Sequence, residues 1–170
     1  MPPLPHRIKG NTTRWIRQWA PALVWAACIW TMSTDYFSAA HTASWIKPIL
    51  RWLDPGISAH TMNEIHHAIR KSAHVVEYFI FTLLLYRGLR GRERGWHLKW
   101  ALIALVTAAC YSGLDEVHQA FVASREASPW DSLLDSSAAL GAMVVYWLWT
   151  RLGTTPPAAQ EVTPAIPPRF

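Results

Sequence analysis

Ionisable side chains recur at helical spacing in the segment RKSAHVVEY, and their types suit binding or catalysis. Lys71, His74 and Tyr78 lie three and four residues apart, which places them on one face of a helix, with Glu77 beside that face. A carboxylate next to an imidazole can transfer protons as a general acid or base, or can hold a divalent metal ion. Lys71 has the charge to bind a phosphate or a carboxylate. The segment therefore predicts a polar site on a helix.

A second group of such residues occurs in GLDEVHQAF. On a helix Asp115, His118 and Gln119 share one face, whereas Glu116 points about 100° away from it. Ion pairs of acids with nearby bases also hold helices together, so a structural role stays open for both groups. Neither segment contains an H-E-x-x-H pattern or a cysteine pair. No metal ligand is assigned for this reason, although a divalent metal remains an alternative.

A third set of polar residues follows shortly afterwards. Arg125 lies in an expected loop, and SPWDSLLD places Asp131 and Asp135 one turn apart on a helix. The same segment is typical of a helix start, because Ser128 can cap it, a proline follows, and Asp131 meets the positive helix end. A structural role for Asp131 is therefore an alternative to a functional one.

The composition indicates a membrane protein. Apolar residues make up 51% of the chain and charged residues only 16%, whereas soluble proteins carry about 25% charged residues. Eleven tryptophans are typical of proteins anchored at the lipid headgroups. The net charge of +5 would allow nucleic-acid binding, but the bases form no stripe interleaved with aromatic residues. We therefore expect no nucleic-acid partner.

Four apolar runs approach the length of about 20 residues that crosses a bilayer. They cover residues 18–34, 72–89, 96–114 and 133–152. The predicted fold class is all-α, a polytopic membrane protein with a bundle of four transmembrane helices. One membrane domain, residues 18–152, then lies between a disordered basic flank, 1–17, and a disordered proline-rich tail, 153–170.

The connection at residues 35–71 is long enough to carry structure of its own. It contains WIKPILRWL, in which Trp45, Ile49 and Trp52 would share one face of a short helix. Such a helix could lie in the outer headgroup layer. An ordinary loop is the alternative.

Basic residues predict the orientation of the helices. Of the 16 Lys and Arg residues, eleven fall in the N-terminal flank, the connection after the second run and the C-terminal side, and five fall in the other two connections. Cytoplasmic loops carry the excess of Lys and Arg. We therefore expect a multi-pass protein of the bacterial cytoplasmic (inner) membrane, with both termini inside. The polar residues of three segments then converge at the outer face, within about two helical turns of it.

Residues 70–145 resemble the VanZ-like family, small integral membrane proteins named after a teicoplanin-resistance protein. The similarity rests on three patterns: K-x-x-H-x-x-E-Y at Lys71, His74, Glu77 and Tyr78; D-E-x-H-Q-x-F at Asp115, Glu116, His118, Gln119 and Phe121; and R-x-x-S-x-x-D at Arg125, Ser128 and Asp131. Two departures are visible. Ala123 and Ser124 stand where members often have Pro-Gly. Members also usually have small residues that include a glycine at the positions of Ser137 to Leu140, and this chain keeps only Gly141, directly after them. The resemblance implies a cell-envelope membrane protein without a settled biochemical activity.

Two functions from different classes fit these residues. The first is a non-catalytic protein that binds a lipid headgroup, a lipid-linked cell-wall precursor or a glycopeptide, with a link to teicoplanin-type resistance. The second is a membrane-embedded enzyme, metal-dependent or not, that acts on a lipid or lipid-linked substrate. Its catalytic candidates are His74, Glu77, Asp115, Glu116 and His118. The ligand-binding candidates are Lys71, Tyr78, Gln119, Arg125, Ser128, Asp131 and Asp135.

A transporter or proton relay is a third interpretation, because chains of Asp, Glu and His serve those roles inside membranes. The two halves of the chain share no inverted repeat, and four helices enclose a pathway poorly. The expected partners are membrane lipids together with a cell-wall precursor or glycopeptide, and a homo-oligomer stays open.

Overall fold

The chain folds into helices joined by short turns. The structure is a computed structural model, and it describes residues 7–123 and 128–153. The elements are α1 (Arg7–Met32), the 3-10 turn η1 (Asp35–Phe37), α2 (Ala39–Leu53), α3 (Ala59–Arg90), α4 (Leu98–Ala120) and α5 (Pro129–Leu152). These ranges contain no strand, so the all-α prediction is confirmed.

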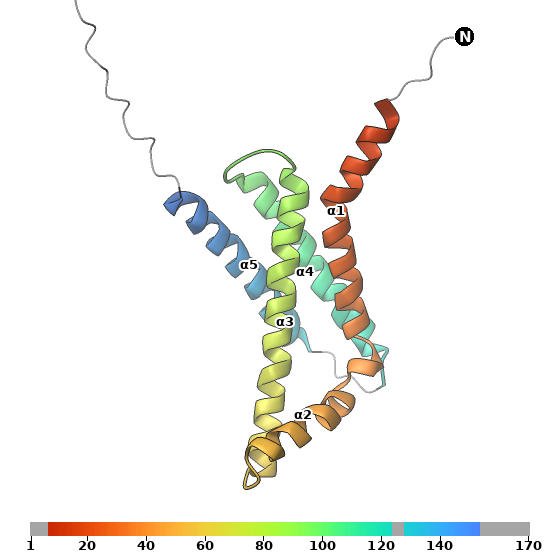
Figure 1. Cartoon of the computed structure of the whole chain (residues 1–170), viewed down its shortest axis with the longest axis vertical. Coiled ribbons are helices and arrows are strands. Elements are labelled where there is room, and N and C mark those ends of the chain that lie inside the picture. Colours follow the sequence, from red (N-terminus) through yellow and green to blue (C-terminus); the bar gives the residue numbers. More distant parts are fainter. Residues whose placement is uncertain (1–6, 124–127, 154–170) are drawn as a thin grey trace, which may run out of the picture.

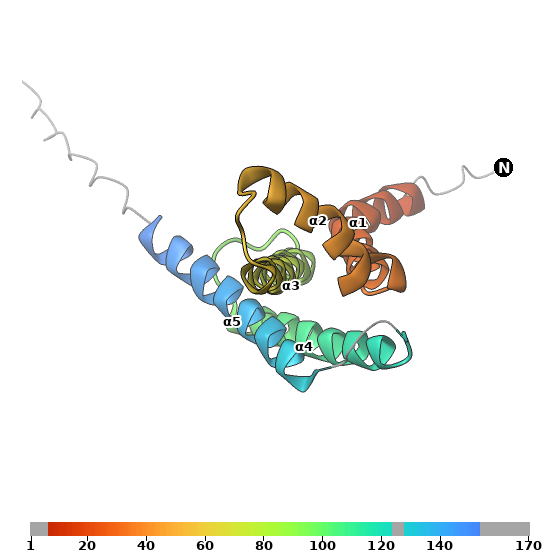
Figure 2. The ribbon, with the colours of Figure 1, turned by 90° about the horizontal axis from the view of Figure 1, so that it is seen from below.

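Helix α3 lies at the centre of the arrangement. It packs against α1, α4 and α5, and α4 also packs against α5. Helix α2 crosses one end of the molecule, from the end of α1 to the start of α3 (Figures 1 and 2). The start of α3, the end of α4 and the start of α5 therefore lie toward the same end as α2, whereas α1 begins and α5 ends at the opposite end (Figure 1).

Small residues let α4 and α5 approach the centre closely. Ala101, Ala104 and Ala108 of α4 are buried at spacings of three and four residues, and so are Ala138 and Ala142 of α5. The larger buried side chains include those that α3 supplies: Tyr78, Phe81, Leu85 and Tyr86. Small residues at helix contacts are typical of membrane bundles, because backbones that pack closely gain van der Waals contact.

The helices extend beyond the predicted apolar runs. Helix α1 begins at Arg7, so residues 7–17 are helical where we expected a disordered flank. Helix α3 begins at Ala59 rather than at residue 72, because the Ser58 hydroxyl accepts the backbone N–H of Thr61 at 3.1 Å and caps the helix there. Hydropathy marks only the apolar part of a helix, and backbone hydrogen bonding continues past it. Residues 154–170, the greater part of the expected tail, lie outside the described residues.

Two helices are long and apolar enough to cross a membrane by length and composition. They are α4 and α5. Among the described residues, α1 and α3 do not reach the same hydropathy, although both correspond to predicted spans. The four-span bundle and the cytoplasmic placement of both termini therefore remain predictions.

The segment expected to be either an interfacial helix or a loop forms α2. Ser38 begins the helix, and its hydroxyl accepts the backbone N–H of His41. Trp45, Ile49 and Trp52 are exposed along α2, and Trp52 is the most exposed of the three at 80%. An apolar exposed row of this kind fits the interfacial helix of the prediction. The position of α2 on a membrane stays a prediction.

Candidate functional site: a buried polar cluster and a basic cleft

The buried faces of three helices change from apolar to polar toward the end that α2 crosses. On α4 the alanine face continues through Ser112, Asp115 and Gln119, all of which are buried. On α5 Asp135 occupies the same kind of position, four residues before the buried Ala139. Because α4 runs antiparallel to α3 and α5, its last turns lie near the first turns of α5 and the middle of α3 (Figure 1). The topology thus gathers the polar residues at one end.

Asp135 lies at the centre of the polar cluster. Its side chain is fully buried, and its Oδ2 accepts a hydrogen bond from the Ser112 hydroxyl at 2.8 Å. Nδ1 of His74 lies 3.5 Å from its Oδ1. The Ser112 hydroxyl also lies 3.1 Å from that of Ser132. The wholly buried Tyr78 has Ser112 and Asp135 among the groups around its hydroxyl. Asp135 therefore connects side chains of α3, α4 and α5.

Asp115 and His118 join α4 to the end of α1. The side-chain amide of Gln119 donates to Oδ2 of Asp115 at 2.9 Å, and the Ser33 hydroxyl lies near the same carboxylate. The ring of His118 stacks on Trp30 with 4.1 Å between centroids. His118 is thus held against an aromatic ring, away from the Asp135 contacts.

Glu116 fastens the start of α5. Its Oε2 accepts the backbone N–H of Ser128 at 2.7 Å, and the residue is buried. On a helical wheel Glu116 points away from the face that carries Asp115. In the structure this direction is toward the start of α5. Ser128 is the N-cap residue and Pro129 starts the helix, so the predicted helix start is confirmed, although the Ser128 side chain makes no capping hydrogen bond. Arg125 lies outside the described residues.

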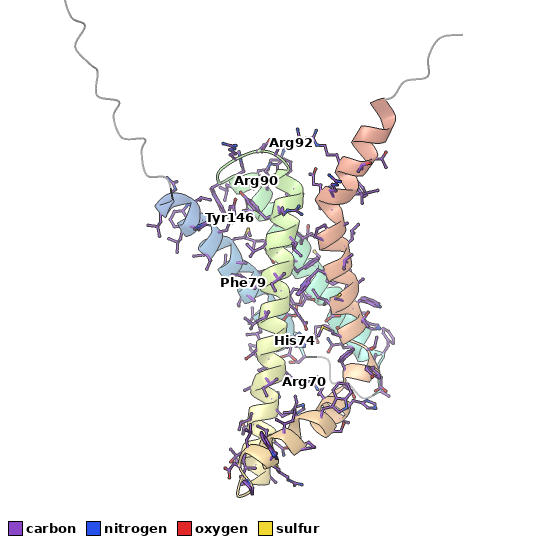
Figure 3. The ribbon with its side chains drawn as sticks, viewed as in Figure 1. Arg70, His74, Phe79, Arg90, Arg92 and Tyr146 are labelled. Carbon is purple, nitrogen blue, oxygen red and sulfur yellow. The ribbon has the colours of Figure 1, made fainter. Side chains whose placement is uncertain are left out.

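A cleft of about 570 Å³ opens next to the cluster, between α3 and α5. It is lined by Ala39, His66, His67, Arg70, Lys71, His74, Ser128, Trp130, Asp131 and Leu134. Arg70 and His74 lie one turn apart near the middle of α3 (Figure 3). Nη1 of Arg70 is buried and lacks a hydrogen-bond partner within the part of the chain that the structure describes. The cleft therefore presents five basic or histidine residues of α3 and a single carboxylate.

His66 connects the cleft to α2. Its Nε2 lies 2.9 Å from the Thr42 hydroxyl. Burial lowers the pKa of His66, and the positive charges of Arg70 and Lys47 and the neighbouring His67 lower it further. The charged form of His66 is therefore disfavoured, and Arg70 and Lys71 supply permanent positive charges to the cleft.

A family model described as VanZ/LLP1 matches residues 18–150 of this chain. The chain belongs to the VanZ/LLP1 family. This match confirms the resemblance seen in the sequence and extends it to most of α1. No curated protein and no solved structure matches the chain. The cleft and the polar cluster both lie inside the VanZ/LLP1 region.

The structure divides the residues of the VanZ/LLP1 patterns between two neighbouring sites. His74, Tyr78 and Asp135 belong to the buried cluster, and Asp115 is close enough to affect it electrostatically. Lys71, Ser128 and Asp131 line the cleft, and His74 also reaches it. Glu77 lines a smaller adjoining pocket of about 90 Å³ together with Arg70 and His74. Glu116 and His118 join α4 to the start of α5 and to α1, and Gln119 donates to Asp115 within α4.

Sequence reasoning missed several residues of this VanZ/LLP1 site. Ser112 is at the centre of the cluster, while Arg70, His66 and Trp130 line the cleft. The four-residue spacing of His66, Arg70 and His74 is a signal for one helical face. It was overlooked because the predicted helix began at residue 72. Ser112 gave no signal beyond its place on the alanine face.

The cleft can bind an anion through Arg70 and Lys71, and His74 and Asp135 beside it could transfer a proton. Guanidinium and ammonium groups bind phosphate and carboxylate, and a histidine oriented by a carboxylate can act as a general base. Within the described ranges no three His, Cys, Asp or Glu side chains group as metal ligands. A divalent ion therefore has no ligand set that these residues define.

Proposed function

We propose that this VanZ/LLP1 protein binds the phosphate or carboxylate group of a lipid, or of a lipid-linked envelope molecule, in the cleft between α3 and α5. The proposal includes a glycopeptide carboxylate as a ligand and places the cleft at the outer face of the bacterial inner membrane. The observation that carries it is that Arg70 lines the cleft while its buried Nη1 has no hydrogen-bond partner among the described residues. A buried charged donor without a partner is costly, and a bound anion would remove that cost.

The other residues of the cleft support an anionic ligand of lipid type. Lys71 is exposed at the cleft and adds a second positive charge. Trp130 is 77% exposed, and its indole can lie at the headgroup level while an acyl chain passes beside it. Asp131 lines the same cleft, and its negative charge favours the charged form of Arg70. These groups suit a headgroup that carries both an anion and hydroxyl or amine donors.

Paired charge removal tests the proposal. We expect the double variant Arg70→Gln and Lys71→Gln to bind phosphatidylglycerol, a polyprenyl diphosphate or teicoplanin at least about 100-fold more weakly, because each of the two hydrogen bonds to a charged group contributes about 1.5–3 kcal/mol. Binding is measured on the purified protein in nanodiscs of phosphatidylcholine, with each probe in turn. The probe whose affinity falls identifies the ligand class.

A matched control removes two charges from the other end of the molecule. Arg94→Gln and Lys99→Gln change the net charge equally, and neither residue lines the cleft. Equal binding by both double variants would contradict the proposal, and so would undiminished binding by the Arg70 and Lys71 variant.

A second candidate function is catalysis on the bound molecule, and the His74 to Asp135 contact favours it. Because Nδ1 faces the buried carboxylate, Nε2 is the ring nitrogen left for a substrate in the cleft. A general base with an orienting carboxylate has the same order of groups, and here Nδ1 and Oδ1 lie 3.5 Å apart without a hydrogen bond between them. An enzyme should lose product formation with His74→Gln while it keeps its affinity for the probe. A binder should form no product with any of the three probes.

A further inference from the structure

We propose a second anion-binding site at the opposite end of the bundle, where α1 and α3 together bind the headgroup phosphate of an anionic phospholipid. A pocket of about 180 Å³ lies there, lined by Arg14, Arg17, Gln18, Arg87, Gly91 and Arg92. Four of the six lining residues are arginines, and none is acidic. The site is separate from the cleft, because Arg92 follows the end of α3 whereas Arg70 lies in the first half of that helix (Figure 3).

Close helix packing brings these arginines together. A Cβ atom on Gly88 would lie 3.0 Å from the ring of Trp19, so the glycine lets α1 approach α3 at this level. The side-chain amide of Gln18 donates to the backbone oxygen of Gly88. Gly91 ends α3 with a φ of 62°, which glycine adopts easily, and Gln18 packs against it. The backbones that carry the four arginines are therefore fixed relative to one another.

The described carboxylates do not neutralise the charge of the pocket. Within the described residues, no carboxylate forms an ion pair with Arg14, Arg17, Arg87 or Arg92. Arg87 reaches the backbone oxygen of Gln18 at 3.5 Å, which leaves its other donors for a ligand. Arginine presents a planar set of donors that matches phosphate oxygens in pairs. Four such groups around one small pocket favour a phosphate over a carboxylate.

Aromatic residues place the pocket at headgroup depth. Trp15 is 58% exposed near the start of α1, and Trp149 is 68% exposed near the end of α5, at the same end of the molecule. Tryptophans of this kind lie at the boundary between acyl chains and headgroups. Basic pockets between membrane helices bind anionic headgroups at this level. On the predicted orientation the lipid belongs to the cytoplasmic leaflet.

Native mass spectrometry of the full chain tests this site. The purified protein is titrated in mild detergent with phosphatidylglycerol, and with phosphatidylcholine of the same chains as the neutral reference. We expect wild type to bind a phosphatidylglycerol that the double variant Arg17→Gln and Arg87→Gln binds at least tenfold more weakly. Phosphatidylcholine binding should not change. Inorganic phosphate is added in a parallel titration, and a lipid site predicts that phosphate competes only weakly.

The control separates a built pocket from general surface charge. Arg94→Gln and Lys99→Gln remove two charges at the same end without touching the pocket, and this variant should bind phosphatidylglycerol as wild type does. An equal loss in both double variants would mean that general charge attracts the lipid, and the proposal would be wrong. Undiminished binding in the Arg17 and Arg87 variant would overturn it as well. The Arg70 and Lys71 variant identifies any lipid bound at the cleft, so the two sites are tested independently.

Discussion

A single buried carboxylate determines how the polar cluster holds together. Asp135 receives a hydrogen bond from Ser112 and lies beside His74, so α3, α4 and α5 meet through one side chain. Charged groups in a low-dielectric interior are costly unless they are paired and hydrogen-bonded. The contacts of Asp135 therefore serve structure whatever else the cluster does, and the structural contribution can be measured.

We expect Asp135→Asn to lower the free energy of unfolding by about 1.5–3 kcal/mol, because the amide keeps the shape of the side chain but loses its charged hydrogen bonds. The measurement is thermal unfolding of the purified protein in detergent. Asp131→Asn is the matched control, since Asp131 is only half-buried at the cleft, and we expect a smaller loss of about 0.3–1 kcal/mol from the helix end. Equal losses would show that Asp135 is not the structural centre.

At the residue scale, the sequence predicted which residues form the polar cluster, but it did not predict which partners they contact. The types and spacing of His74, Asp115 and Asp135 predicted a shared polar end, and the structure brings these side chains together. Ser112 could not be found in this way, because a serine on an alanine-rich face has the pattern of any small buried residue. Nor could the role of Glu116, since its bond to Ser128 depends on the turn between α4 and α5.

At the scale of the helices, hydropathy predicted the apolar segments, whereas the polar helix ends depend on caps and on contacts with other helices. Apolar runs predicted most of α4 and α5 but not the last six residues of α4 or the first four of α5, because these helix ends are more polar than the rest. The first 13 residues of α3, Ala59 to Lys71, are too polar for such a run, and their helix depends on the Ser58 cap and on contact with α2. As a result Arg70 fell in the connection before the apolar run at residues 72–89, and the sequence did not predict its place in the cleft.

Contact between α1 and α3 depends on Gly88. We expect Gly88→Leu to lower the free energy of unfolding by about 1–3 kcal/mol, the usual cost of overpacking, because even a Cβ atom would lie 3.0 Å from the ring of Trp19. Thermal unfolding in detergent measures the loss.

Gly113 of α4 provides the control for this helix contact. A Cβ atom there meets nothing within 4 Å, so Gly113→Ala should raise stability by about 0.5–1 kcal/mol through its helix preference. If Gly88→Leu unfolds at the wild-type temperature, then α1 does not rely on this contact, and the arginine pocket loses its fixed backbone.

The whole molecule has tryptophans toward both of its ends. On α5, Trp130 and Trp149 are separated by 19 residues, which is about 29 Å of helix at 1.5 Å per residue. This distance is close to the thickness of about 30 Å of the bilayer hydrocarbon core. Helix α3 runs antiparallel to α4 in the same bundle, and its polar residues face the cleft and the cluster. Its modest hydropathy is therefore consistent with a helix that crosses the membrane beside α4 and α5.

Single cysteines on either side of α3 test whether it crosses and in which direction. Cys28 and Cys110 are free, so both are first replaced by alanine. Gly56→Cys then marks the turn before α3, and Arg94→Cys marks the turn after it. We expect a membrane-impermeant maleimide to label Gly56→Cys in intact cells and Arg94→Cys only after the membrane is opened, because basic residues concentrate on the cytoplasmic side. The reverse pattern would place the cleft inside the cell and rule out ligands of the outer leaflet. Labelling of both cysteines in intact cells would mean that α3 does not cross the membrane at all.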